Sequence, residues 1–291
     1  MVIFLMPWRV AATILSCISV VGAIEFPATL DVDIIYPRNG TFAPTVLTPI
    51  IFAIRNPQLA EPLVLNFQWD IYKGESPLSD GPFSFGSKDL QWVDFSNISD
   101  PYFVYTSTNK LNFEDSWWIR WSVAWGNCSE SPGTIDPVKT SFSYRNNVVE
   151  FTTKNGTRPL DLSSVNTADD DTCGNVTDTR VTFNVTGVLD TSFPSRYGGR
   201  ETCAVLASSS NSTAPPPTRT CGAEVGASAA SSILAAITSQ ACAGFATNPN
   251  VACPTESPSS AARGKGAQFL AGSTTWLKTL TFARIMYNFV L

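Results

Sequence analysis

The stretch from Trp117 to Trp125, W-W-I-R-W-S-V-A-W, has the clearest alternation of apolar and other side chains in the chain. Every second residue is large and apolar: Trp117, Ile119, Trp121, Val123 and Trp125. Because a strand sends successive side chains to opposite faces, the pattern predicts one strand with an aromatic wall on one face. Trp118 and Arg120 then share the other face. Such a wall is either the centre of a β-sandwich core or a platform for a ligand.

Shorter runs with strand character precede and follow this stretch, with turn residues between them. They predict strands near residues 30–36, 49–54, 63–70, 90–95, 102–106, 138–144, 148–153, 180–185 and 201–206. Residues 74–89 are rich in Gly, Ser and Pro and predict a loop, and Asn146-Asn147 predicts a hairpin turn. We therefore expect a mainly β fold, an immunoglobulin-like β-sandwich over residues 24–206.

The composition changes after this domain. Residues 207–220 form a Ser/Pro-rich linker. Residues 221–253 contain the one good helical pattern, an Ala-rich stretch between Cys221 and Cys242, which predicts a disulfide-bracketed helical appendage with a short Ala-rich C-terminal helix. Residues 254–291 are a second linker and an apolar tail. The tail contains Lys278 and Arg284, so it is either an interrupted lipid-anchor signal or an unstructured end.

Residues 1–23 have the features of a signal peptide. Arg9 precedes an apolar run that is shorter than a membrane span, and Val21-Gly22-Ala23 is a small-residue cleavage site. The alternative is an uncleaved N-terminal anchor. The signal peptide predicts an extracellular protein, secreted or at the cell surface.

Two further features fit the secretory route. Six cysteines remain after the signal peptide, and this even number predicts three disulfides whose pairing the sequence leaves open: Cys128, Cys173, Cys203, Cys221, Cys242 and Cys253. Seven sequons predict N-glycosylation in exposed loops or strand edges: Asn39, Asn97, Asn127, Asn155, Asn175, Asn184 and Asn211.

The net charge excludes some partners. The chain has a net charge of −5, and loss of Arg9 with the signal peptide makes it −6. Nucleic acid normally requires a basic surface, so we expect no nucleic-acid partner. Attraction to anionic lipid is also disfavoured, and membrane contact is expected only through the C-terminal lipid anchor.

Two long phrases resemble a known family. F-P-A-T-L-D-V-D-I-I-Y-P-R-N-G-T-F and P-I-I-F-A-I-R-N-P-Q-L-A, together with the cysteine-bracketed S-A-A-S-S-I-L-A-A-I, are similar to a fungal family of secreted proteins with a domain of unknown function. The resemblance covers most of the mature chain up to about Cys253. It implies extracellular placement in a fungus, often with a lipid-anchor-like tail, and it supplies no catalytic residues.

The absence of histidine limits the chemistry. It excludes Ser/His/Asp and Cys/His nucleophilic arrangements and histidine metal ligands. Asp169, Asp170 and Asp171 match no calcium-loop spacing and predict a solvated acidic turn. A carboxylate-dependent glycoside hydrolase would need two acids facing one cleft. The nearest candidates are ordinary loop acids: Asp70, Asp94, Glu114 and Asp115. We expect no catalytic residues, no metal, no cofactor and no enzyme activity.

The sequence thus leaves three hypotheses. The first is a non-enzymatic cell-surface glycoprotein with a structural or interaction role at the cell wall. The second is an extracellular carbohydrate-binding module that uses exposed aromatic side chains against cell-wall polysaccharide, with ligand-binding candidates Trp118, Arg120, Trp69 and Trp92. The third is the hydrolase. Trp117, Trp121 and Trp125 are expected in the core.

Overall fold

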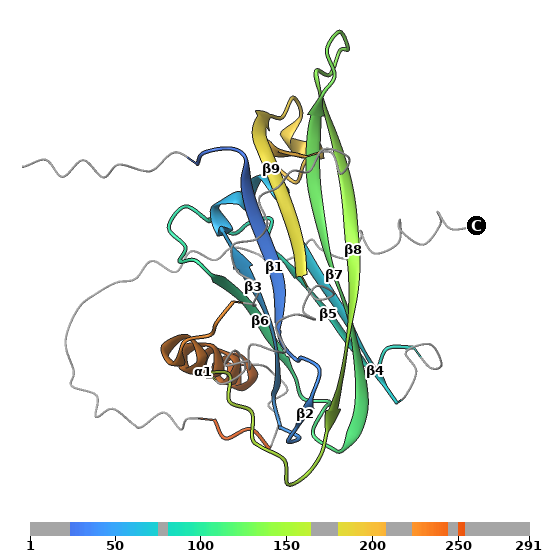
Figure 1. Cartoon of the computed structure of the whole chain (residues 1–291), viewed down its shortest axis with the longest axis vertical. Helices are drawn as coiled ribbons and strands as arrows, with labels where there is room; N and C mark the ends of the chain where they lie inside the picture. The colour runs from blue at the N-terminus through green and yellow to red at the C-terminus, as the bar shows by residue number, and fades with distance from the viewer. Residues whose placement is uncertain (1–23, 75–80, 164–179, 208–222, 244–249, 254–291) are drawn as a thin grey trace, which may run out of the picture. The chain divides into compact units, whose positions relative to one another are not determined.

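The computed structural model describes residues 24–74, 81–163, 180–207, 223–243 and 250–253. Within them the chain forms ten strands, short 3₁₀ turns and one α-helix (Figure 1). The strands are β1 (Ala28–Tyr36), β2 (Thr41–Phe42), β3 (Thr48–Arg55), β4 (Asn66–Lys73), β5 (Ser84–Asp89), β6 (Tyr102–Thr108), β7 (Asp115–Glu130), β8 (Val138–Thr153), β9 (Arg180–Asp190) and β10 (Thr202–Leu206). The 3₁₀ turns are η1 (Pro57–Leu59), η2 (Glu61–Leu63) and η4 (Pro194–Arg196), and the helix is α1 (Ala227–Ala243).

The strands form two five-stranded sheets. The first sheet has the order β10-β9-β1-β3-β6, and the second has the order β2-β8-β7-β4-β5. β7, the tryptophan strand, pairs antiparallel with β4 on one side and with β8 on the other. The mainly β, sandwich-like fold is therefore confirmed, with two sheets enclosing one core. The immunoglobulin-like detail of the expectation is not confirmed.

The core lies between the sheets and contains the predicted aromatic wall. Trp117 and Trp121 are fully buried, so their prediction as core residues is confirmed. Phe52 of the first sheet contacts Trp121 of the second, with ring centroids 5.4 Å apart. Trp125 is half-buried and packs edge-on against Phe183 at 5.0 Å. Rings from both sheets interlock here, which supplies much of the apolar burial that stabilises the sandwich.

The alternation of burial along β7 changes phase at Trp125. From Trp117 to Val123 the odd-numbered side chains are buried, whereas beyond Trp125 the even-numbered Gly126 and Cys128 are buried. The segment after β9 causes the change. The Tyr197 ring packs so closely on Gly126 that a Cβ atom there would lie 2.5 Å from it. The C-terminal end of β7 is therefore covered on its even-numbered face, the face on which Arg120 is exposed.

Two disulfides join described residues. Cys128 of β7 bonds to Cys203 of β10, which links the two sheets covalently, and Cys242 of α1 bonds to Cys253. In the chain-entropy model, closing a loop of 75 residues lowers the entropy of the unfolded chain and so stabilises the folded state by roughly 4 kcal/mol. The other two cysteines, Cys173 and Cys221, lie outside the described residues.

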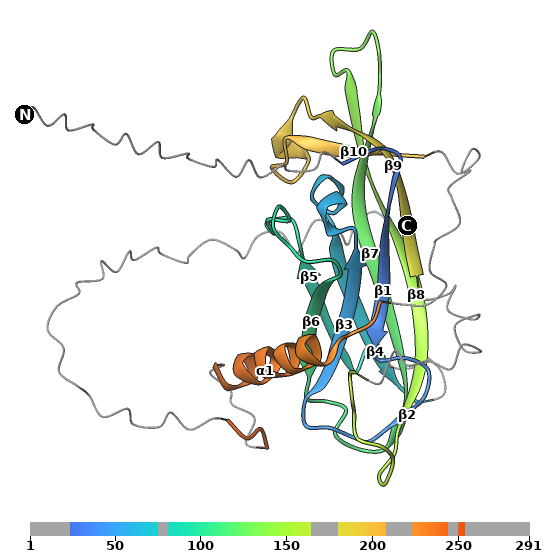
Figure 2. The ribbon, with the colours of Figure 1, turned by 60° about the vertical axis from the view of Figure 1, so that its left-hand side comes forward.

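α1 confirms the predicted helix, which was expected within residues 223–241. Its buried side chains Ala230, Ile233 and Ile237 pack against Ile35 and Ile51, on the face of the first sheet that points away from the core. Both views place α1 beside β3 and β6 (Figures 1 and 2). Within the described part of the chain, no helix has the length and apolar character needed to span a membrane.

Several strand predictions were wrong in detail. β8 is one continuous strand, because β7 offers it a partner along its whole length, and Asn147 pairs with Trp121 in place of a hairpin turn. The predicted loop 74–89 contains the edge strand β5. The predicted strand 90–95 is a turn, whose Val93 N–H donates to the Leu90 carbonyl. The strand predicted over residues 63–70 begins only at Asn66, after η2.

A buried ion cluster lies on the first sheet. Asp33, only 1% exposed, accepts from Arg55 at 3.2 Å and from Arg180 at 3.1 Å. Arg38 is close by, and burial lowers the pKa of its guanidinium while Asp33 raises it. Asp33 therefore compensates several cations that have little access to water.

The remaining domain predictions lie wholly or mostly outside the described residues. These are the signal peptide at residues 1–23, the linker at 207–220, the tail at 254–291 and the acidic turn at 169–171. They stay predictions.

Candidate functional site

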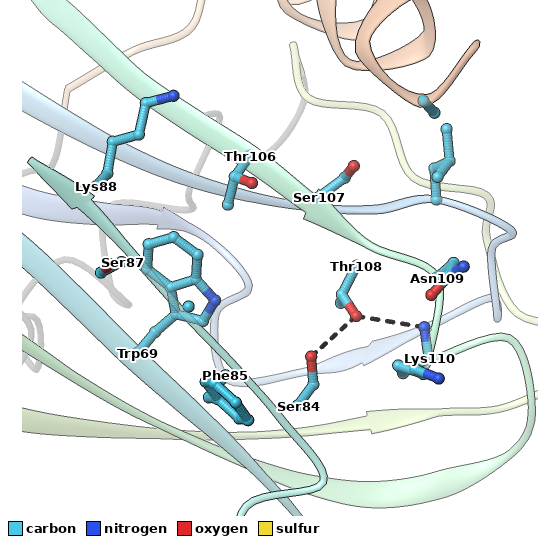
Figure 3. A pocket seen from close by; sticks show the side chains of 13 residues that line it. Trp69, Ser84, Phe85, Ser87, Lys88, Thr106, Ser107, Thr108, Asn109 and Lys110 are labelled. Atoms are coloured by element: carbon cyan, nitrogen blue, oxygen red, sulfur yellow. Dashed lines mark hydrogen bonds between the residues drawn. The ribbon is translucent and has the colours of Figure 1, made fainter. Parts of the chain in front are cut away.

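A groove of about 500 Å³ opens between the edge strands of the two sheets, β5 and β6 (Figure 3). Its size is within the range of small-ligand sites, roughly 300–1,000 Å³. Most of its described lining is polar or small, and its residues are Leu47, Trp69, Ser84, Phe85, Gly86, Ser87, Lys88, Thr106, Ser107, Thr108, Asn109, Lys110 and Ala241.

The groove exists because small and polar residues replace apolar ones at the edge of the core. Gly86 of β5 pairs with Trp69 of β4, so alternate residues of β5 share the core-facing side of the second sheet with Trp69. On β6, Thr106 and Thr108 follow the buried Val104 at intervals of two and therefore share its face. Neither edge supplies enough apolar volume to close the sheets on each other.

Trp69 forms the aromatic wall of the groove. It is 7% exposed, and its indole lies against Gly86, where a Cβ atom would be 2.4 Å from Cζ2 of the ring. Only glycine leaves room for the indole in this position. Figure 3 shows the indole nitrogen of Trp69 on the side of Thr108 and Ser84. The groove therefore presents a fixed aromatic edge next to hydroxyl groups.

A hydroxyl pair bridges the two sheets beside the tryptophan. Ser84 Oγ of β5 lies 3.1 Å from Thr108 Oγ1 of β6, and the backbone N–H of Lys110 donates to the same threonine oxygen at 3.3 Å (Figure 3). Each hydroxyl carries one hydrogen and two lone pairs, and their mutual bond uses only one of the two hydrogens. The Lys110 N–H uses a second lone pair, so one hydroxyl hydrogen and two lone pairs remain for a ligand.

No acidic side chain lines the groove in the described part of the chain. The acids considered for hydrolysis are engaged elsewhere. Asp70 pairs with Arg120 at 2.7 Å, Asp115 pairs with Lys73 at 3.0 Å, and Glu114 accepts from the Asn155 N–H at 2.6 Å. The Ser96 backbone N–H donates to Asp94, which lowers the pKa of that carboxyl. The groove thus offers hydrogen bonding and stacking, without the carboxylate pair of a glycoside hydrolase.

Two of the four predicted ligand-binding residues lie together. Trp118 and Arg120 lie on the outer face of the second sheet, where Trp118 pairs across the strands with Tyr72. Arg120 is exposed, its guanidinium lies 5.4 Å from the Tyr72 ring centroid, and the bond with Asp70 raises its pKa. Trp118 is half-buried, and its indole nitrogen is covered. Neither residue lines the groove between β5 and β6.

The other two predicted residues do not lie with this pair. Trp69 points to the opposite face of the same sheet, into the groove. Trp92 is 77% exposed in the turn after β5, where its ring lies beside Gly199. Arg200 donates to the carbonyls of Gln91 and Val93 and fixes this turn. The four residues therefore lie at three separate places, and only Trp118 and Arg120 are neighbours on one face.

The predicted glycosylation sites differ in their surroundings. Asn39, Asn97 and Asn155 are exposed, as expected for acceptor sites in loops. Asn127 and Asn184 are half-buried within β7 and β9, where Ser141 donates to the Asn127 side chain at 3.0 Å. Asn175 and Asn211 lie outside the described residues. Glycosylation itself remains a prediction.

Sequence reasoning missed most of the groove. Ser84, Gly86 and Lys88 lie within the stretch predicted as a loop, and Thr108 and Lys110 lie beyond the predicted strand 102–106, where no pattern marks them. The small residues Ser84 and Gly86, two positions apart in S-F-G-S-K, are the one local signal. The contact between Ser84 and Thr108 depends on how the sheets pack, which no local pattern contains.

Among known proteins, only a family model matches this chain. A protein-family model described as "Domain of unknown function (DUF7136)" matches residues 25–253, which is also the extent of the resemblance noted in the sequence. No curated protein and no solved structure matches the chain. Among the residues that the structure describes, no group of three or more His, Cys, Asp or Glu side chains is arranged to hold a metal ion.

Proposed function

The chain belongs to the DUF7136 family, and we propose that it is a non-catalytic extracellular glycoprotein of the fungal cell surface that binds cell-wall polysaccharide in the groove between β5 and β6. The signal-peptide sequence and two disulfides support an extracellular location, because disulfides form in oxidising compartments.

One observation carries the proposal: an indole held in place by a glycine, beside a hydroxyl pair with unused hydrogen-bonding capacity. A sugar ring has apolar C–H faces and a rim of hydroxyls. It needs an aromatic surface for the first and neutral donors and acceptors for the second. The groove provides both, and the side chains at its wall are held by the sheets, which lowers the entropy lost on binding.

The absence of acids from the described lining favours binding over hydrolysis. A glycosidase protonates the leaving oxygen and attacks from a second carboxylate. Ser84, Thr108 and Trp69 can hold a sugar, but they offer no acid for that proton transfer. Incubation with soluble β-glucan and chitin oligosaccharides is therefore expected to release no new reducing ends.

The outer face of the second sheet supports a second candidate site. Trp118 and Arg120 lie on this face beside the buried Tyr72, and the exposed Phe85 on the neighbouring edge strand lies opposite Asp70. An aromatic sheet face suits the surface of an insoluble polysaccharide better than a single chain. Trp118 and Arg120 do not line the groove, so we place this site second.

Three matched variants separate the candidate sites: Trp69→Phe in the groove, Trp118→Phe on the outer face and Trp92→Phe in the exposed turn. Each replaces an indole with a smaller ring and removes one N–H donor. We expect Trp69→Phe to weaken binding of the secreted protein to chitin or β-glucan about tenfold, the effect of losing about 1.4 kcal/mol.

Trp92→Phe serves as the control and is expected to bind like the wild type. A loss confined to Trp118→Phe would move the site to the outer face. No retention of the wild type above a heat-denatured control would remove the polysaccharide-binding proposal altogether.

A further inference from the structure

The only charged side chains that line the described part of the groove are two lysines. Lys88 comes from β5 and Lys110 is the second residue after β6, so the two walls of the groove contribute one each. Figure 3 shows them at opposite ends of the groove, with Trp69, Thr106 and Thr108 between them. A ligand that extends along the groove therefore meets a cation at each end.

Neither lysine is neutralised within the described residues. Elsewhere in that part of the chain, some cations pair closely with carboxylates, as Lys73 does with Asp115 at 3.0 Å and Arg120 with Asp70 at 2.7 Å. Lys88 and Lys110 have no carboxylate within 4.0 Å among these residues. They are nevertheless part of a chain with a net charge of −5. The groove is thus a positive site on an acidic protein.

We infer that the groove selects an anionic oligosaccharide, one with a carboxylate or phosphate group on the sugar units that reach its two ends. The inference rests on the proposed function, since it assigns the charge of the ligand in the same groove. The sugar between the charged units lies against Trp69 and hydrogen-bonds with Ser84 and Thr108. Its flanking anions lie near Lys88 and Lys110.

Lysine rather than arginine at these positions leaves the anion type open. A guanidinium fixes a planar, two-point geometry, whereas an ammonium is a flexible point charge that accepts carboxylate and phosphate alike. Polyuronates and phosphorylated mannans therefore share the required chemistry. The test includes one arm for each.

The test compares each anionic oligosaccharide with a neutral form that has the same backbone. Oligogalacturonate is compared with its methyl ester, and a phosphorylated mannan fragment with its dephosphorylated form, by calorimetry on the full-length secreted protein. We expect at least one anion to bind about tenfold more tightly than its neutral form in low salt, consistent with two partly exposed charge pairs. This preference should decrease as the salt concentration rises towards 0.5 M, because the screening length there is on the order of 4 Å and the charges attract each other less.

Variants assign the preference to the two lysines. Lys88→Gln and Lys110→Gln are each expected to lose about three- to fivefold of it, because one exposed charge pair contributes up to about 1 kcal/mol. Lys154→Gln, an exposed lysine that does not line the groove, is the control and should keep the preference.

The outcomes separate the two proposals. Equal binding of the charged and neutral forms that depends on Trp69 would overturn charge selection and leave polysaccharide binding standing. An anion preference that survives both lysine substitutions would also overturn the inference. Binding of neither form by the wild type would overturn the inference alone, because polysaccharide binding is tested separately on chitin and β-glucan.

Discussion

A Cβ atom on Gly86 would lie 2.4 Å from Cζ2 of Trp69 and 2.8 Å from Cε2, so the indole occupies the space that any other side chain would need. Gly86→Ala forces the ring to move. We expect the free energy of unfolding to fall by about 1–3 kcal/mol, the usual effect of overpacking, and retention on polysaccharide to fall with it. Denaturant unfolding and a binding assay measure the two effects.

Gly187→Ala is the matched control for that substitution. Gly187 also lies in a strand, and a Cβ atom there would meet nothing within 4 Å. Gly187→Ala is expected to leave the free energy of unfolding unchanged or to raise it by up to about 1 kcal/mol, because alanine has fewer backbone conformations than glycine in the unfolded chain. Equal effects of the two substitutions would show that contact with Trp69 is not what requires glycine at position 86.

The ion cluster of Asp33 predicts that replacing this aspartate lowers the free energy of unfolding much more than replacing Asp70. Asp33→Ala leaves Arg55 and Arg180 without this buried carboxylate and is expected to destabilise by roughly 3–5 kcal/mol. Asp70→Ala removes the partner of Arg120, whose side chain is 49% exposed, and should cost less than about 1 kcal/mol. Chemical denaturation of both variants tests this, and similar losses would contradict the buried role of Asp33.

The disulfide between the sheets predicts a loss of stability without a loss of fold. Replacing Cys128 and Cys203 together by serine releases a loop of 75 residues and is expected to lower the free energy of unfolding by roughly 4 kcal/mol. Polysaccharide binding by the folded variant should persist, because β10 and β6 are at opposite ends of the first sheet. A folded variant that no longer binds would contradict this separation of the two edges.

Buried tyrosines predict alkaline unfolding. Burial raises the pKa of Tyr197, whose hydroxyl donates to the Pro62 carbonyl at 2.8 Å, and burial also raises the pKa of Tyr36. Above about pH 10 the unfolded chain loses these protons while the folded chain keeps them, so stability falls by up to about 1.4 kcal/mol per pH unit for each tyrosine. Below that pH their contribution is fully present.

Unfolding measurements between about pH 9 and 11 follow this decline. Tyr197→Phe and Tyr36→Phe should each make it shallower, because each removes one proton from the difference between the folded and unfolded states. Tyr144→Phe, at a position that is 70% exposed, controls for loss of a phenol hydroxyl at the surface. The same slope for the wild type and both buried variants would refute the prediction.

Local patterns in the sequence predicted the parts of the fold that depend on local periodicity. Strict alternation placed Trp117 and Trp121 on one buried face, and alanine-rich helical spacing located α1. The hairpin turn predicted at Asn146 and Asn147 was wrong, because the turn preference of two residues is weak compared with sixteen residues of continuous pairing between β7 and β8. Tertiary pairing outweighed local propensity there.

The candidate site was not predictable in the same way. The sequence indicates Trp69 as a possible ligand contact, but Gly86 and Ser84 lie in a segment predicted to be a loop, and Thr108 lies beyond the predicted strand 102–106. Ser84 and Thr108 are 24 residues apart and belong to different sheets. The sequence contains both residues, but only the packing of the sheets places them together. For the same reason, the sequence did not predict the pairing of Cys128 with Cys203, since it depends on how the sheets pack.

The bond between Cys128 and Cys203 also determines what a protease can do to this protein. The tip between β7 and β8 lies inside the loop that the bond closes, and Ile135 at that tip is completely exposed. Exposed tips are preferred cleavage sites. A cut there leaves the two fragments covalently joined and still paired along β7 and β8. The nicked protein should migrate as one band until it is reduced and then separate into two, so a single cleavage outside the cell need not release either half.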